Sequence, residues 1–401
     1  MTFKRGPRKR ILLIAMANSI HVARWIDLMV DMDVDVRLIS SNPSTSLHPR
    51  IASILARRDT APGIRLSIPL ISQHFSMYLW AADRFLDDWL RGLLIFIELL
   101  RFRPSLVHVL ELQNAGYPLL KALKITPPAL KPKVFITNYG SDVYWYKDLD
   151  SHVARLKALM KVADAYSAEC ERDVQIAKGL GFKNQIFRTA PVTGGMGLEE
   201  LVQDLGPNAL RARKVIALKG YQGQWGRAIE ALECICNIPI EILRGFTVEI
   251  YSCEPEVKQA SRKLSEMGIS VKCHPKGALS HEQVLEIFRK SRVYVGLSVS
   301  DGISTSMLEA MSQGAVPVQT NTSCANEWLT SRSQGFIASL DDPSGTTRAL
   351  QQILSDDDYV LRAQSQNIKV ISDRYEKRKL KKIVEDYYSS LLCSESLRER
   401  E

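Results

Sequence analysis

One short stretch carries the clearest structural signal: residues 296–314, GLSVSDGISTSMLEAMSQG. A strand is expected to end near Ser298, small polar residues then predict a turn, and a helix is expected to start near Ser304 or Thr305. The first N–H groups of a helix have no partner within it and attract an anion that lies before the helix. The stretch therefore predicts a strand–turn–helix unit with an anion site at the turn.

Similar units repeat on both sides of that stretch. Apolar runs typical of buried parallel strands lie at residues 10–15, 34–40, 63–68, 105–111, 133–139, 165–169 and 185–189, and in a second series at 215–219, 246–253, 270–274, 293–298 and 315–320. Helical patterns separate them, including residues 77–101 and 306–313. This alternation predicts an α/β fold of two Rossmann-like, doubly wound parallel sheets.

The break between the two series falls where glycine and proline gather, at residues 191–208. We expect an N-terminal domain over residues 1–195, a linker over 196–212 and a C-terminal domain over 213–375. A last helix over 376–393 is expected to cross back to the N-terminal domain. Ligands of open parallel sheets bind outside the carboxyl ends of the strands, so we expect the two domains to face each other across a cleft that holds the site.

Composition excludes several classes of protein. The chain has 401 residues, 45% hydrophobic and 24% charged, as in soluble globular proteins, and its seven scattered cysteines indicate reduced thiols rather than a disulfide scaffold. The longest apolar stretch, residues 92–100, is much shorter than the roughly 20 residues that span a bilayer, so we expect a cytoplasmic protein.

The net charge of +9 is unevenly distributed. Residues 1–195 hold 27 Lys+Arg against 17 Asp+Glu, a net charge of +10, and the remainder has a net charge of −1. Such an excess indicates an anionic partner, either a membrane surface or a phosphate-bearing lipid acceptor; a solvated surface without a specific partner is the alternative. The residues expected to meet that partner include Lys4, Arg5, Arg8, Lys9 and Arg10. Nucleic acid is disfavoured, because no dense basic stripe is interleaved with aromatic residues.

Candidate ligand-binding residues gather in the second series. Glu309 follows the predicted helix start within two turns, where it can accept hydrogen bonds from a ribose diol, and Asp301 can hold sugar hydroxyls. The alternative is that Ser304 or Thr305 only caps the helix and Glu309 is a capping carboxylate.

A glycine-rich turn between two cations, Lys219 and Arg227, opens the C-terminal domain. It suits a departing pyrophosphate without an obligatory metal ion, or else it is a tight turn with solvated cations. No Gly-x-Gly-x-x-Gly with a following acid appears there, which disfavours a nicotinamide enzyme.

The first series offers polar residues after two of its strands. His21 stands at the start of the first helix, and Tyr139 and Asp142 follow the run at 133–139. Each can serve a bound ligand, or His21 can pack and Asp142 can cap a helix. Asp31, Asp33 and Asp35 resemble a metal motif but lie at the wrong edge of the sheet, so we expect no metal site.

Taken together, these motifs resemble retaining glycosyltransferase family 4, the glycosyl transferases group 1. Asp301-x7-Glu309-Ala-Met-x-x-Gly314 is similar to its acidic-x7-Glu motif, with Asp in place of the usual Glu. His21-Val-Ala-Arg-Trp is similar to its opening segment, and Tyr139 replaces the His of its His-Gly-Ser-Asp turn.

The resemblance implies a GT-B fold and a defined set of roles. Asp301 and His21 would be catalytic, Tyr139 and Asp142 would serve the acceptor side, and the donor would be bound by Lys219, Arg227, Ser304, Thr305 and Glu309. The implied reaction is transfer from a nucleoside-diphosphate sugar to a glycan, lipid-linked or small-molecule hydroxyl, with retention of configuration and no obligatory cofactor.

The same resemblance places such a hexosyltransferase in polysaccharide assembly, with peripheral contact at the inner membrane face. Two rivals remain open: a sugar-nucleotide epimerase of the same fold, and a catalytically silent homologue that serves as a binding subunit.

Overall fold

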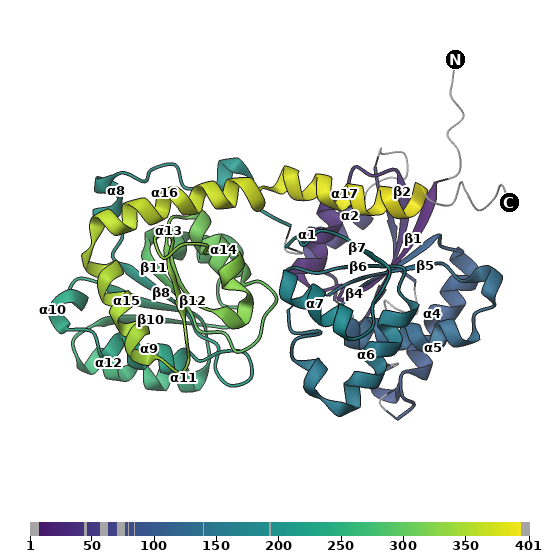
Figure 1. The fold of residues 1–401 in the computed structure, drawn as a ribbon, viewed down its shortest axis with the longest axis horizontal. Coiled ribbons are helices and arrows are strands. Elements are labelled where there is room, and N and C mark those ends of the chain that lie inside the picture. The colour runs from purple at the N-terminus through teal and green to yellow at the C-terminus, as the bar shows by residue number, and fades with distance from the viewer. Residues whose placement is uncertain are drawn as a thin grey trace, which may run out of the picture. The chain divides into compact units, whose positions relative to one another are not determined.

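The computed structural model describes residues 8–43, 46–56, 63–69, 77–78, 80–83, 85–138, 140–191 and 194–393. The chain forms two compact units, each built on a parallel sheet (Figure 1). The first unit comprises Met1–Gly194 together with Lys377–Glu401, and the second comprises Gly195–Glu376. The prediction of two parallel-sheet α/β domains is confirmed.

The first sheet has seven parallel strands in the order β3-β2-β1-β4-β5-β6-β7. Their bounds are β1 Lys9–Ala15, β2 Val34–Ser40, β3 Arg65–Ser67, β4 Leu106–Leu110, β5 Lys133–Thr137, β6 Ala165–Ser167 and β7 Gln185–Ile186. The central strands are continuous apolar runs because both of their faces are covered by helices. Strand β1 lies between β2 and β4, so the chain changes direction across the sheet at the β1–β4 pair.

The helices of this unit are α1 Ile20–Met29, α2 Pro49–Leu55, α4 Trp89–Phe102, α5 Tyr117–Ile125, α6 Asp150–Val162, α7 Glu171–Gly179 and α17 Lys377–Cys393. Short π and 3₁₀ segments lie at Leu112–Gly116, Pro128–Leu130 and Tyr146–Asp148. The helix expected over residues 77–101 is interrupted. Residues 77–78 and 80–83 are helical, but residues 85–88 form a turn in which Asp87 and Asp88 have φ angles of 48° and 68°, so α4 starts at Trp89.

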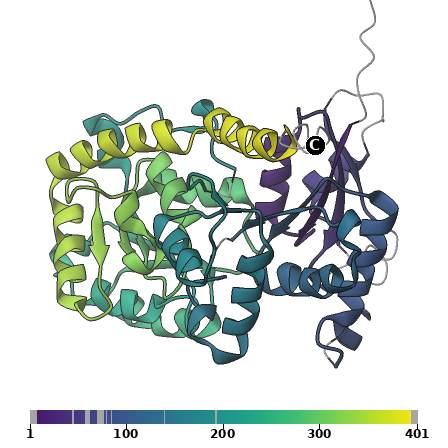
Figure 2. The ribbon, with the colours of Figure 1, turned by 45° about the vertical axis from the view of Figure 1, so that its right-hand side comes forward.

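A buried polar network joins α17 to this sheet. The Tyr388 hydroxyl lies 2.6 Å from Nδ1 of His108 on β4 and accepts a hydrogen bond of 2.9 Å from the indole of Trp25 on α1. All three side chains are buried, and α17 packs along α1 (Figures 1 and 2). The last helix is thus part of the first unit. At the amino ends of β1 and β2, Asp31 pairs with Lys381 and Asp33 pairs with Arg8.

The second sheet has six parallel strands in the order β10-β9-β8-β11-β12-β13. Their bounds are β8 Val215–Lys219, β9 Thr247–Cys253, β10 Ser270–Pro275, β11 Ser291–Gly296, β12 Val316–Thr320 and β13 Phe336–Ala338. Its helices are α8 Pro207–Ala212, α9 Ala228–Cys236, α10 Ile240–Leu243, α11 Pro255–Ala260, α12 Arg262–Glu266, α13 His281–Lys290, α14 Thr305–Ser312, α15 Pro343–Ser355 and α16 Asp357–Arg374. Short 3₁₀ segments lie at Leu198–Glu200, Asn321–Ser323 and Ala325–Glu327.

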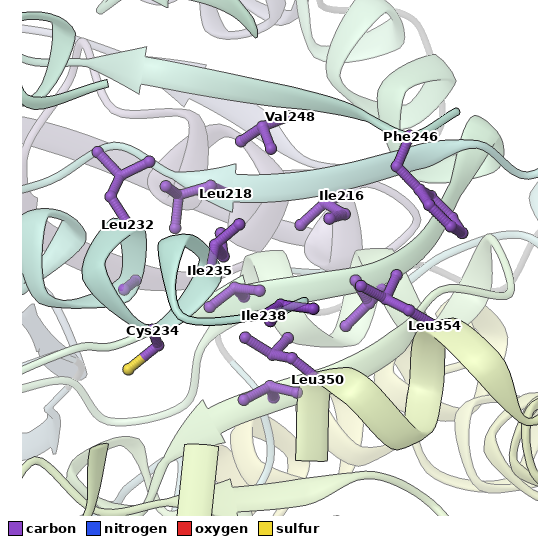
Figure 3. Close-up of a cluster of buried hydrophobic side chains, with 14 of the residues drawn as sticks. Ile216, Leu218, Leu232, Cys234, Ile235, Ile238, Phe246, Val248, Leu350 and Leu354 are labelled. Atoms are coloured by element: carbon purple, nitrogen blue, oxygen red, sulfur yellow. The ribbon is translucent and has the colours of Figure 1, made fainter. Parts of the chain in front are cut away.

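An apolar core lies between this sheet and helices α9 and α15. Ile216 and Leu218 of β8 point toward Leu232 of α9 and Leu350 of α15, and all four are buried (Figure 3). Burial of each such side chain contributes about 1.5–3 kcal/mol, so this core holds the carboxyl ends of the central strands in fixed positions. Among the described residues, none of the helices is long and apolar enough to cross a membrane.

Candidate functional site

The order of the strands identifies one edge position in each sheet where a ligand site is expected. In the second sheet the chain runs outward from β8 through β9 to β10 on one side, and from β11 through β12 to β13 on the other. The loops that leave β8 and β11 therefore diverge at the carboxyl ends of these strands, which is the general ligand position of such sheets. Lys219 ends β8, and Asp301 follows β11.

Backbone hydrogen bonds tie these two loops together. Arg227 N donates to Leu297 O at 2.8 Å, and Val299 N donates to Trp225 O at 3.3 Å. Position 226 has no room for a side chain, because a Cβ on Gly226 would lie 2.4 Å from Tyr221 O. The glycine-rich turn is thereby held against the segment that follows β11.

This arrangement brings Lys219 and Asp301 together. Lys219 Nζ lies 3.8 Å from Asp301 Oδ2, with side chains 15% and 25% exposed. Burial lowers the pKa of Lys219, but Asp301, Tyr294 and Tyr221 outweigh it and raise that pKa above its ordinary value. The ammonium is therefore charged at neutral pH. Asp301 also accepts a hydrogen bond from Gly302 N at 3.0 Å, which fixes its carboxylate at the turn.

Arg227 lies in the same loop, but its side chain turns back on the loop itself. Its guanidinium donates to Gly226 O at 2.9 Å and to Gly223 O, and its Nε lies 3.4 Å from Glu230 Oε1. In this position Arg227 holds the glycine-rich turn in shape. The role predicted for it in donor binding stays a prediction.

Ser304 and Thr305 stand at the start of α14 in different surroundings. Ser304 is the N-cap, fully buried, and its hydroxyl accepts a hydrogen bond from Met307 N at 3.3 Å. Thr305 is the first helical residue and is half-buried. It shares a helix face with Glu309, four residues further on. Thr305, rather than the capping Ser304, is therefore the hydroxyl that can face a ligand.

Glu309 is only 5% exposed and contacts a histidine that the sequence reasoning did not select. Nε2 of His281, the first residue of α13, lies 2.7 Å from Oε1 of Glu309. A carboxylate only accepts hydrogen bonds, so the imidazole donates from Nε2. The Ser280-x-x-Gln283 capping box marks the start of α13 in the sequence, but nothing local indicates that this helix start lies beside α14.

The predicted residues of the first unit lie at the corresponding edge of its sheet. His21 follows β1, and its backbone N donates to the N-cap hydroxyl of Ser19 at 3.2 Å. Asp142 follows β5, and its Oδ2 accepts from Leu112 N at 3.2 Å. Asp142 therefore ties its own loop to the first residue of the π segment Leu112–Gly116, which follows β4. Tyr139 lies outside the described residues.

Glu111 is a further residue at the edge of the first sheet. It follows β4, at the point where the chain changes direction across the sheet, and it is 6% exposed. Its φ of 86° lies in a region that favours glycine. Burial raises its pKa to about 7, against smaller lowering effects from Ser41, Asn114 and Arg91. Strain and a raised pKa at such a position are typical of functional sites.

Replacing Glu111 with glutamine is expected to stabilise the protein in a pH-dependent way. The pKa is raised from 4.5 to about 7, so between these values the folded state binds the proton that the unfolded state has released. The free energy of unfolding of the wild type therefore falls as pH rises through this window. Glu111→Gln should be more stable by up to about 3 kcal/mol at pH 8 and nearly equal at pH 4.5. Urea unfolding at both pH values measures this, and an equal difference at both would contradict it.

A comparison with models of protein families finds a match that lies entirely within the second unit. Residues 244–370 match the family model described as glycosyl transferases group 1. This segment includes α13, β11, α14 and β12, and with them Asp301, Glu309 and His281. None of the curated proteins searched matches the sequence.

Solved structures with the same fold cover almost the whole chain. Sucrose-phosphate synthase from Thermosynechococcus elongatus is 13% identical with a TM-score of 0.68, over 96% of this chain and 100% of that one. A glycosyltransferase from Rickettsia africae is 12% identical with a TM-score of 0.68, over 97% and 100%. HepE from Anabaena in complex with UDP-glucose is 11% identical with a TM-score of 0.65, over 95% and 99%. The fold is that of the GT-B glycosyltransferases.

Proposed function

Since the chain carries a group 1 glycosyltransferase domain on a GT-B fold, we propose that it transfers a sugar from a nucleoside-diphosphate sugar to a hydroxyl group, with retention of the anomeric configuration. The observation that carries the proposal is the Lys219–Asp301 pair at the diverging ends of β8 and β11, beside the start of α14. A cation and a helix start suit a diphosphate, and the adjacent carboxylate suits sugar hydroxyls.

The departing diphosphate is where negative charge grows during the reaction. Lys219 lies in a mostly buried position, where its charge interacts more strongly than in water. The N–H groups at the start of α14 and the Thr305 hydroxyl add donors that need no reorganisation. These groups together stabilise the leaving group, and Arg227 supports the turn that carries Lys219.

Sugar transfer itself exchanges one bond at the anomeric carbon for another. The bond from that carbon to the diphosphate oxygen breaks, and the acceptor oxygen bonds to the carbon from the same face. The acceptor proton passes to a departing phosphate oxygen, so no covalent bond to the protein is needed. Asp301 orients the sugar through its hydroxyls, and Glu309 accepts hydrogen bonds from the ribose.

We propose that the first unit binds the acceptor. We propose that His21 contacts the reacting groups and that Tyr139 and Asp142 serve the acceptor. The charge excess of residues 1–195 supports an acceptor that carries negative charge, such as a lipid-linked glycan of polysaccharide assembly, met by a cytoplasmic enzyme at an anionic membrane face. Large apolar side chains exposed in the same unit also suit such a surface; they include Phe85, Leu86, Trp89 and Leu93.

A panel of UDP-, GDP- and ADP-sugars tests donor binding. One of them is expected to raise the melting temperature, because a ligand that binds only the folded state at 100 times its Kd stabilises it by about 2.7 kcal/mol. The HepE structure with UDP-glucose makes UDP-glucose the first donor to try. No shift with any donor would favour the silent binding subunit.

An assay with and without acceptor separates the remaining rival. Transfer requires an acceptor for the sugar to leave the nucleotide, whereas an epimerase converts the sugar nucleotide alone. Product formation that depends on added glycan or lipid-linked glycan supports the proposal. A new sugar nucleotide formed without any acceptor would overturn it.

A further inference from the structure

The contact between His281 and Glu309 joins two helices that start at the same edge of the second sheet. His281 is the first residue of α13, and Glu309 lies in the second turn of α14. The side chain of His281 is 39% exposed, whereas that of Glu309 is 7% exposed. A half-exposed imidazole thus reaches a nearly buried carboxylate at 2.7 Å.

The position of His281 is fixed by local interactions in α13. Ser280 N donates to Gln283 Oε1 at 2.8 Å, and Gln283 N donates to Ser280 Oγ at 3.2 Å. This reciprocal pair sets where the helix begins. Leu285 and Phe288, further along α13, are buried and hold the helix in the unit. The imidazole is therefore presented to Glu309 by a rigid helix start and not by a loop.

A carboxylate that binds a ribose diol must hold its oxygens in one orientation. A donor on Oε1 restricts rotation of the carboxylate and adds a charge-assisted hydrogen bond. It also lowers the cost of keeping a carboxylate in a nearly buried place before the ligand arrives. His281 meets both needs and remains partly open to solvent.

From this geometry we propose that His281 is a positioning residue that orients the Glu309 carboxylate for the ribose of the donor nucleotide. The inference rests on the proposed function, because it assumes that Glu309 binds ribose. A positioning role for His281 differs from a purely structural contact between α13 and α14 in its consequence. If His281 positions Glu309, its loss weakens recognition of the ribose hydroxyls selectively.

The test measures binding of a nucleoside diphosphate and its 2′,3′-dideoxy form by calorimetry. The probe is UDP, GDP or ADP, whichever raises the wild-type melting temperature most. His281→Ala is expected to weaken binding of the ribonucleotide about tenfold and to leave binding of the dideoxy form, which has no ribose hydroxyl for Glu309, within about twofold. His281→Gln, which can donate an amide N–H, should restore most of the affinity. Glu282→Ala, the exposed neighbour on α13, is the matched control and should bind as the wild type does.

A double variant separates positioning from general stability. In a Glu309→Gln background, His281→Ala should cost much less than tenfold, because the two residues act through one interaction. Equal weakening of both nucleotides, or full additivity, would overturn the role of His281 and leave the proposed function standing. Failure of the wild type to bind any of the three nucleotides would overturn both.

Discussion

Lys219→Met is expected to lower kcat/KM for sugar transfer by about 100- to 1,000-fold, mainly through kcat. Lys219 lies 3.8 Å from Asp301, and burial of its side chain to 15% exposure strengthens its field on a departing diphosphate. Methionine keeps the apolar stem of the side chain and removes only the ammonium. Steady-state kinetics with the donor identified by the panel measure the effect.

Lys276 provides a matched control for this variant. Both ammonium groups lie over the ring of Tyr221, Lys219 at 5.1 Å and Lys276 at 5.6 Å from its centre. Lys276 is exposed, so solvent and salt screen its charge. Lys276→Met should change kcat/KM by less than about threefold. If Lys219→Met instead kept the wild-type kcat while folding normally, the diphosphate would have to bind elsewhere.

The regular elements of the fold could be predicted because they depend on local patterns. The opening strand was expected at residues 10–15 and lies at Lys9–Ala15, and the helix expected at 306–313 lies at Thr305–Ser312. Apolar runs bounded by turn residues specify such strands wherever both faces of a sheet are covered. The carboxyl edge of each sheet followed from the alternation, and with it the loops that carry Lys219 and Asp301.

What could not be predicted depends on contacts between distant segments or on single backbone angles. His281 and Glu309 are 28 residues apart, and only the packing of α13 beside α14 joins them. The left-handed conformations of Asp87 and Asp88 delay the start of α4, although their sequence also permits a helix. Arg227 is predicted to bind a donor phosphate, and nothing in its spacing indicates that its guanidinium donates to carbonyls of its own loop.

Glu309→Gln is expected to weaken donor binding by about 10- to 100-fold with a much smaller change in kcat. The carboxylate can accept hydrogen bonds from two ribose hydroxyls, whereas an amide accepts on one atom only and donates from the other. The ribose is remote from the anomeric carbon, so its contacts act on the ground state and the transition state alike. Such a loss raises KM and leaves kcat nearly unchanged. Calorimetric titration of the donor and steady-state kinetics measure the two quantities separately.

The contrast between Glu309→Gln and Lys219→Met gives the strongest test of the proposed site. The amide oxygen of glutamine can still accept from His281 Nε2, so the packing of α13 on α14 should survive the change. Glu286→Gln is the control, because Glu286 also sits in ion pairs on α13, with Lys290 and Arg289, but at the surface. A Glu309→Gln variant that lost kcat and kept donor affinity would place Glu309 at the reacting carbon instead of the ribose. Separate effects, on KM for Glu309 and on kcat for Lys219, require one nucleotide that spans both residues along the edge formed by β8, β11 and α14.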